Sequence, residues 1–195
     1  MRMPFATLER YEEALETISQ RVRRAAAALE KHAVPYAVIG GNAVAAWVSR
    51  VDPEAVRGTR DVDITIRRAD LPRATEAMAE AGFQFRQVLG IPMFVDVVKP
   101  TVKGGVHLVF ADEKVRPTDL HAVPSIPENP PRSLEDYAVV PLESLIRMKL
   151  TSFRRKDQVH ILDMLELGLI TPEIEKSLPA DLMARLQELK DTPNG

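Results

Sequence analysis

Two carboxylates one residue apart, Asp61 and Asp63, are the part of this sequence best suited to chemistry. They lie in Asp61-Val62-Asp63-Ile64-Thr65-Ile66, which alternates polar and apolar residues as a strand does. Side chains of a strand alternate between two faces, so both aspartates point one way and the apolar residues point the other. Paired carboxylate oxygens suit a hard dication such as Mg²⁺ or Mn²⁺. The alternative is a solvated edge strand with two surface acids.

A second motif stands upstream, where the apolar run Tyr36–Ile39 stops on Gly40-Gly41. A short apolar run followed by glycines and an Ala-rich segment predicts a buried strand that turns sharply into a helix, with Asn42 as the N-cap. Glycine lets backbone N–H groups approach a ligand, and a helix N-terminus favours anions, so phosphate is the expected guest. Taken alone, a Gly-Gly pair is usually only a turn.

Together, the two motifs resemble those of the nucleotidyltransferase superfamily, which has a polymerase-beta-like fold. The sequence is most similar to a small bacterial group that includes abortive-infection-type toxins and minimal nucleotidyltransferases. The resemblance spans about residues 30 to 170 and rests on Gly40-Gly41-Asn42-Ala43 with Trp47, and on Arg57-x-Thr59-Arg60-Asp61-x-Asp63. Further support comes from Leu145-Ile146-Arg147-Met148-Lys149 and Arg154-Arg155-Lys156-Asp157.

The resemblance implies a Mg²⁺-dependent transfer of a nucleoside monophosphate from ATP or another NTP to a hydroxyl of an acceptor. Asp61 and Asp63 would hold Mg²⁺ or Mn²⁺ against the triphosphate. The implied nucleotide-binding residues are Gly40, Gly41, Asn42, Thr59, Arg60, Lys149 and Arg154. The acceptor, which is a protein, an RNA or a small molecule, is not indicated. For Lys149 and Arg154, the alternative is a basic helix end favoured by the helix dipole.

The family pattern breaks at the third carboxylate, which normally lies on the strand beside the aspartate pair and acts as the base. By order along the chain, His107 in Val106–Phe110 takes this place. A histidine there is a base near neutral pH, a ligand of a softer metal, a sign of lost activity, or a core residue. Asp96 is the rival candidate for the third acid.

Composition bounds the remaining possibilities. Hydrophobic residues make up 45% and charged residues 28% of 195 residues, as in an ordinary globular protein. The net charge of -2 gives no overall basic field for nucleic acid, and the lack of cysteine excludes disulfides and thiolate metal sites. No stretch has the apolar length of a signal peptide or a membrane span, so we expect a cytoplasmic protein without membrane contact. Oligomeric state is not indicated.

The elements that must position these residues follow from periodicity. Helical spacing over Thr7–Lys31 and from Pro141 onward encloses several short strands, with a proline-rich connection over 111–131. We therefore expect an α/β (α+β) fold, with a nucleotidyltransferase-like mixed sheet flanked by helices and a helical C-terminal tail. We assign 1–132 to the core and 133–195 to a helical segment packed on it. Asp157, His160 and Asp163 share one helix face.

Two classes of function remain. One is the nucleotidyltransferase described above. The other is a catalytically degenerate protein of the same fold that binds nucleotide, RNA or a partner protein, and a toxin–antitoxin component is compatible with either. P-loop kinases are excluded because no Gly-Lys-Ser/Thr signature is present. A two-carboxylate glycosidase is disfavoured because neighbouring acids on one face leave no room for a sugar between them.

Overall fold

The computed structural model describes residues 5–59, 61–98, 100 and 104–192, with the backbone only for 5–12 and 14. Within these residues the α-helices are α1 (Phe5–Lys31), α2 (Gly40–Val48), α3 (Leu71–Glu80), α4 (Leu142–Ser152), α5 (Arg155–Glu166), α6 (Pro172–Ser177) and α7 (Ala180–Asp191). The strands are β1 (Tyr36–Ile39), β2 (Val62–Ile66), β3 (Phe83–Val88), β4 (Ile91–Asp96) and β5 (Val106–Phe110). Short 3₁₀ turns, η1 (Pro53–Ala55) and η2 (Arg68–Asp70), precede β2 and α3.

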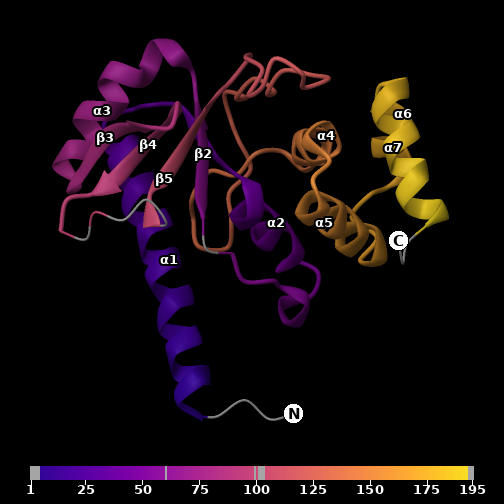
Figure 1. The fold of residues 1–195 in the computed structure, drawn as a ribbon, viewed down its shortest axis with the longest axis horizontal. Coiled ribbons are helices and arrows are strands. Elements are labelled where there is room, and N and C mark those ends of the chain that lie inside the picture. The colour runs from indigo at the N-terminus through magenta and orange to yellow at the C-terminus, as the bar shows by residue number, and fades with distance from the viewer. Residues whose placement is uncertain (1–4, 60, 99, 101–103, 193–195) are drawn as a thin grey trace.

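The strands form one mixed sheet in the order β1-β2-β5-β4-β3. β2 and β5 run parallel, whereas the other neighbouring pairs are antiparallel. Helices flank this sheet and continue as a helical C-terminal segment (Figure 1). The predicted α+β fold with a mixed sheet is confirmed.

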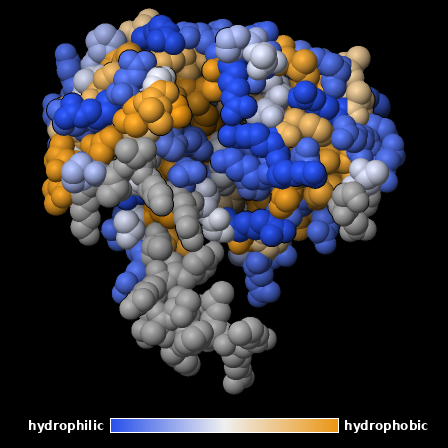
Figure 2. Space-filling model, viewed as in Figure 1, coloured by the Kyte–Doolittle hydropathy of each residue, from blue (hydrophilic) through white to orange (hydrophobic). Residues whose placement is uncertain are grey.

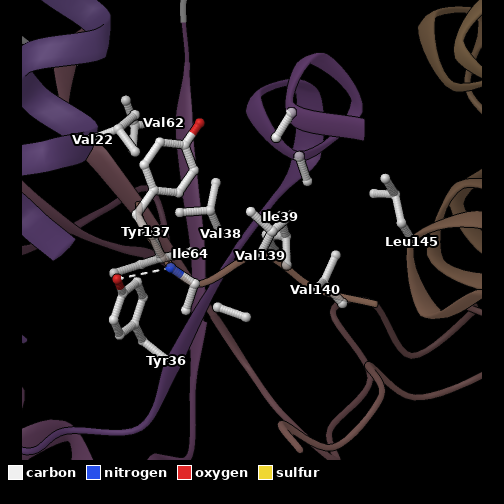
Figure 3. Close-up of a cluster of buried hydrophobic side chains, with 14 of the residues drawn as sticks. Val22, Tyr36, Val38, Ile39, Val62, Ile64, Tyr137, Val139, Val140 and Leu145 are labelled. Carbon is white, nitrogen blue, oxygen red and sulfur yellow. Dashed lines mark hydrogen bonds between the residues drawn. The ribbon is translucent and has the colours of Figure 1, made fainter. Parts of the chain in front are cut away.

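One face of the sheet is the main apolar face. Val62, Ile64 and Ile66 on β2 are almost fully buried, which confirms the alternation expected from the sequence. α1 and α3 lie together against this side of the molecule (Figure 1), and Val22 of α1 lies beside Val62 in the core (Figure 3). Removing this apolar surface from water holds β2 in one register, because a one-residue slip would bury both aspartates.

The chain beyond the proline-rich connection continues the core. Val139 lies beside Val38 of β1, and the Trp47 indole donates a hydrogen bond to the carbonyl of Val140 (Figure 3 shows the valines). Buried side chains of α4, α5 and α7 belong to the same apolar cluster as the sheet, among them Leu145, Ile146, Leu150, Ile161, Met164, Leu182 and Leu186. The division at residues 132 and 133 stays a prediction.

Two further expectations concern the proline-rich connection and the lack of a membrane span. Residues 111–141 contain no helix or named strand in the structure, as the recurring prolines predicted. Among the described helices, none combines the length and the apolar character that crossing a membrane requires.

Candidate active site

The glycine pair and the aspartate pair meet at the end of β1. Gly40 has a φ of +69°, and a Cβ at this position would lie 2.2 Å from Asp63 Oδ2. At Gly41 a Cβ would lie 2.6 Å from Thr59 Oγ1. A larger residue at either glycine would therefore displace the side chain of Asp63 or of Thr59, which belong to the aspartate motif. The two glycines allow the aspartate strand and its lead-in loop to pack against the start of α2.

Asn42 holds this arrangement together, although not as predicted. The expectation that it caps the helix is wrong: α2 begins at Gly40, and its N-cap is Ile39, which makes no side-chain cap bond. The positive φ of Gly40 starts the helix directly after the strand, so Asn42 falls inside the first turn. Its Nδ2 donates a 2.7 Å hydrogen bond to the carbonyl oxygen of Asp61. Asn42 thus fixes the backbone that carries the first aspartate.

His107 lies directly beside Asp63. The parallel register of β2 and β5 pairs the two residues, and Nδ1 of His107 is 3.1 Å from Asp63 Oδ1. The hydrogen bond that His107 donates to the Asp63 carboxylate raises the pKa of His107 above its ordinary value, against the effects of burial and of Lys156. The negative charges of Asp63 and Asp61 add to the increase, so all three groups lie close together. Nε2 has no hydrogen-bond partner among the described residues.

Asp96, the rival third acid, is not part of this group. Met93 of β4 is opposite His107, and Asp96, three residues further on, therefore points to the other face of the sheet. There it is opposite Phe83 and forms an ion pair with Arg24 of α1. The expectation that Asp96 completes the aspartate pair is corrected by the alternation of β4.

The predicted phosphate contacts Lys149 and Arg154 both bind Asp157. Lys149 Nζ donates to Asp157 Oδ1 at 2.9 Å, and Arg154 Nε donates to Asp157 Oδ2 at 2.7 Å. Burial lowers the pKa of Lys149, whereas the two cations hold the pKa of Asp157 below its ordinary value in spite of burial. Both cations also interact electrostatically with Asp63. Lys149 and Arg154 therefore lie on the same side of the molecule as the aspartate pair, and the Arg154 side chain is half-exposed.

The loop before β2 is held by different contacts. Thr59 Oγ1 is 3.5 Å from the carbonyl oxygen of Asp61, a contact that supports the loop, and its predicted part in nucleotide binding stays a prediction. Arg57, at the start of the same motif, forms an ion pair with Asp163 of α5. Arg60 lies outside the described residues.

The structure adds two residues that the sequence did not single out. Lys156, at the start of α5, is close enough to His107 to oppose its protonation. Asp119, in the proline-rich connection, also raises the pKa of Arg154, although its contribution is smaller than that of Asp157. The basic run 154–156 gave a signal for Lys156, but nothing in the local sequence around Asp119 indicated its place.

The donor set fits one kind of metal site. Among the described residues, no three acidic or histidine side chains are placed to share one ion. Mg²⁺, however, is commonly held by one or two carboxylates, with phosphate oxygens and water completing the octahedron. Asp61 and Asp63 meet that requirement for a nucleotide-bound ion. Hydrophilic residues cover much of the face of the molecule that Figure 2 shows, with hydrophobic patches among them.

Comparison with known proteins supports the fold. No protein-family model matches the sequence, and no curated protein sequence matches it. Among solved structures, an antigenic nucleotidyltransferase-like protein from Paracoccidioides brasiliensis is 18% identical, with 93% of this chain and 91% of that chain covered and a TM-score of 0.57. ANT(2″)-Ia in complex with adenylyl-2″-tobramycin is 15% identical, with coverage of 88% and 97% and a TM-score of 0.54.

At these identities the likeness concerns the fold. The chain has a nucleotidyltransferase fold, with a mixed sheet, a glycine turn into α2 and two aspartates at the start of β2.

Proposed function

We propose that this protein is a Mg²⁺-dependent nucleotidyltransferase, which moves a nucleoside monophosphate from an NTP to an acceptor hydroxyl. The observation that carries the proposal is the contact between the two motifs, in which Asp63 fills the space that a side chain at Gly40 would need. Adjacent carboxylates repel each other and are a poor device for stability. Their placement against a helix that begins with two glycines suits a polyphosphate carrying a dication.

In this proposal the nucleotide lies between α2 and the start of α5. Asp61 and Asp63 hold the ion, and the backbone N–H groups at Gly40 and Gly41 bind phosphate. Arg154, whose guanidinium is half-exposed, and Lys156 supply positive charge from the opposite side. Lys149 acts through its ion pair with Asp157, which fixes the first turn of α5. When bound, Mg²⁺ neutralises charge on the phosphates and polarises the reacting one.

The transfer step is a displacement at the α-phosphorus. The acceptor oxygen forms a bond to the α-phosphorus. The bond between the α-phosphorus and the oxygen that bridges it to the β-phosphorus breaks, and pyrophosphate leaves with the electron pair. The hydroxyl proton passes to Nε2 of His107, while Asp63 orients the ring through Nδ1. His107 therefore takes the place of the usual third acid as base. Positioning and electrostatics supply most of the catalysis.

The acceptor and the base of the nucleotide are not fixed by these residues. The solved structure of ANT(2″)-Ia contains an adenylyl group joined to tobramycin. ATP is therefore the first donor to test here, with small molecules, RNA and proteins that carry hydroxyls as acceptors.

The direct test is binding of Mg-ATP by variants of the aspartate pair. Asp61→Asn and Asp63→Asn should each lower the affinity by about 10- to 100-fold, as loss of metal ligands or their close partners does. Asp191→Asn, on the exposed end of α7, is the control and should bind as the wild type does. Unchanged affinity in the aspartate-pair variants would refute the site.

His107 favours one alternative, a protein of the same fold that binds nucleotide, RNA or a partner without transferring anything. At its position the family has a carboxylate, and here the side chain bonds to Asp63 instead. Incubation with labelled nucleotide, Mg²⁺ or Mn²⁺ and candidate acceptors separates the two proposals. Binding without transfer supports the alternative. A role in a toxin–antitoxin pair is compatible with both and is tested by the neighbouring genes.

A further inference from the structure

The side chain of Arg57 is fixed to α5 by a two-point contact. Its Nε is 2.6 Å from Asp163 Oδ2, and its Nη2 is 2.9 Å from Asp163 Oδ1. This paired geometry is the strongest and most directional form of the arginine–carboxylate interaction. Asp163 is largely buried on the helix, whereas 61% of the Arg57 side chain is exposed. A rigid acid on α5 therefore holds an arginine that reaches out from a loop.

The same loop is fixed at its other end. The carbonyl oxygen of Asp61 accepts hydrogen bonds from Asn42 of α2 at 2.7 Å and from Thr59 at 3.5 Å. Only residues 58–60 separate the two fixed ends. The contact of Arg57 with Asp163 and that of Asp61 with Asn42 therefore restrain the described ends of this loop.

The helix that holds Arg57 also faces the aspartate pair. Arg154, the residue just before α5, interacts electrostatically with Asp63, and Lys156 in its first turn interacts with His107. The Arg57–Asp163 contact thus joins the loop that carries Asp61 to the helix whose basic start lies across the site. Loss of the contact would free the loop from α5 while leaving the Asn42 bond in place.

We propose that Asp163 is a positioning residue that acts through Arg57, holding loop 57–61 so that Asp61 stays beside Asp63 for the metal-bound nucleotide. This inference rests on the proposed function. It also assigns Arg57 a role other than phosphate binding, because two of its three guanidinium nitrogens already donate to Asp163. Most of the Arg57 side chain is exposed, so solvent screens the pair, its contribution to global stability is small, and the expected effect is local.

The test compares Asp163→Asn with Glu166→Gln. Glu166 lies one turn further along α5 and also acts electrostatically on Arg57, but it forms no ion pair with it in the described structure. The two variants remove the same charge from the same helix. Three quantities are measured on the full chain: amide exchange of residues 57–61 without ligand, affinity for Mn-ATP, and the unfolding temperature.

We expect Asp163→Asn to speed amide exchange in 57–61 and to weaken Mn-ATP binding by about tenfold, the lower end of the range for supporting residues of metal sites. Its unfolding temperature and all three quantities for Glu166→Gln should stay close to the wild-type values. Equal behaviour of the two variants would overturn the proposal, as would a global loss of stability without a local change in exchange. If the wild type binds no Mn-ATP, the proposed function fails, and the exchange measurement still decides whether Asp163 holds the loop.

Discussion

At the scale of single residues, the Asp63 carboxylate occupies the space that a side chain at Gly40 would need. Gly40→Ala would place a methyl group 2.2 Å from Asp63 Oδ2 in a backbone with positive φ. Gly168→Ala is the matched control, because its φ is +67° and nothing lies within 4 Å of the added Cβ. Both variants should lose about 1 kcal/mol of unfolding free energy from the backbone alone.

Only Gly40→Ala should also lose affinity for Mg-ATP, by at least about tenfold, because the carboxylate must move. Urea unfolding measures the first effect and calorimetric titration the second. Equal nucleotide affinities of the two variants would show that the Gly40–Asp63 contact has no role in binding.

His107 gives a second prediction at this scale. His107→Gln keeps a side chain of similar size that cannot accept the proton, so kcat should fall by about 100-fold or more with little change in KM. His107→Asp serves as the comparison, because it restores the acid that the family has at this place. Steady-state rates with a responsive acceptor decide the matter. Full activity of the glutamine variant would exclude His107 as the base.

Single residues also show where sequence reasoning reaches its limit. The alternation of β2 was enough to place its apolar residues on the buried face, and chain order was enough to place His107 beside Asp63. The cap role of Asn42 was wrong because Gly40, with its positive φ, starts the helix early, so that the N-cap is Ile39, three residues before Asn42. The role of Asp96 was wrong because the sequence does not contain the register of β4 against β5.

At the scale of elements, α5 shows how one helix face serves several contacts. The three-residue spacing of Asp157, His160 and Asp163 predicted a shared face, but not their partners. Asp157 binds Lys149, whereas Asp163 binds Arg57, which is 106 residues away in the chain. Contacts between distant segments depend on how α5 packs against the loop before β2, and periodicity carries no such information.

His160, between these two acids, makes stability depend on pH. Burial lowers its pKa to about 4, and Nδ1 is buried without a hydrogen-bond partner among the described residues. The unfolded chain therefore binds a proton at higher pH than the folded chain does. The resulting stability is present above the ordinary histidine pKa of about 6.5 and is lost as the pH falls toward 4.

The prediction is that His160→Gln removes this part of the pH dependence. Between pH 6.5 and 4, the wild type should lose about 2 kcal/mol more unfolding free energy than the variant, after allowance for partial exposure of the ring. Urea unfolding at several pH values measures the difference. Parallel curves for the two proteins would show that His160 is not held neutral by burial.

The sequence also predicted less exactly where a strand begins and ends. The apolar run of the sequence predicts the second strand of the hairpin over Met93–Val98, but in the structure β4 is Ile91–Asp96. The shift comes from a tight turn in which Leu89 has a φ of +50°. Gly90, with a φ of +80°, is a residue that turns favour, but a leucine with positive φ is uncommon, so residue preferences did not indicate that Leu89 belongs to the turn.

At the scale of the whole molecule, the pairing of β2 with β5 determines the site. Two intervening strands, β3 and β4, lie outside this pair in the sheet, so the chain returns to the middle to place His107 beside Asp63. The sequence predicted a mixed sheet flanked by helices, which is confirmed. It could not predict the strand order, because apolar alternation is the same for a central strand and for its neighbours.

The two sides of the site also come from distant parts of the chain. α2 and β2 supply the glycines and acids, whereas α5 supplies the basic residues from the C-terminal helices (Figure 1). The shared apolar cluster of these parts keeps the two sides in place. Correct geometry at the aspartate pair therefore depends on the packing of α4 and α5 as much as on the sheet.

The central claim is that Asp61 and Asp63 hold a metal-bound nucleotide against the start of α2. The most direct measurement is a crystal structure with Mn²⁺ and a non-hydrolysable ATP analogue, in which anomalous scattering locates the ion. We predict Mn²⁺ bound to both carboxylates, with the triphosphate over Gly40 and Gly41. A nucleotide bound elsewhere, for example in the cavity between Arg68 and Phe110, with no ion at the aspartates, would contradict the account.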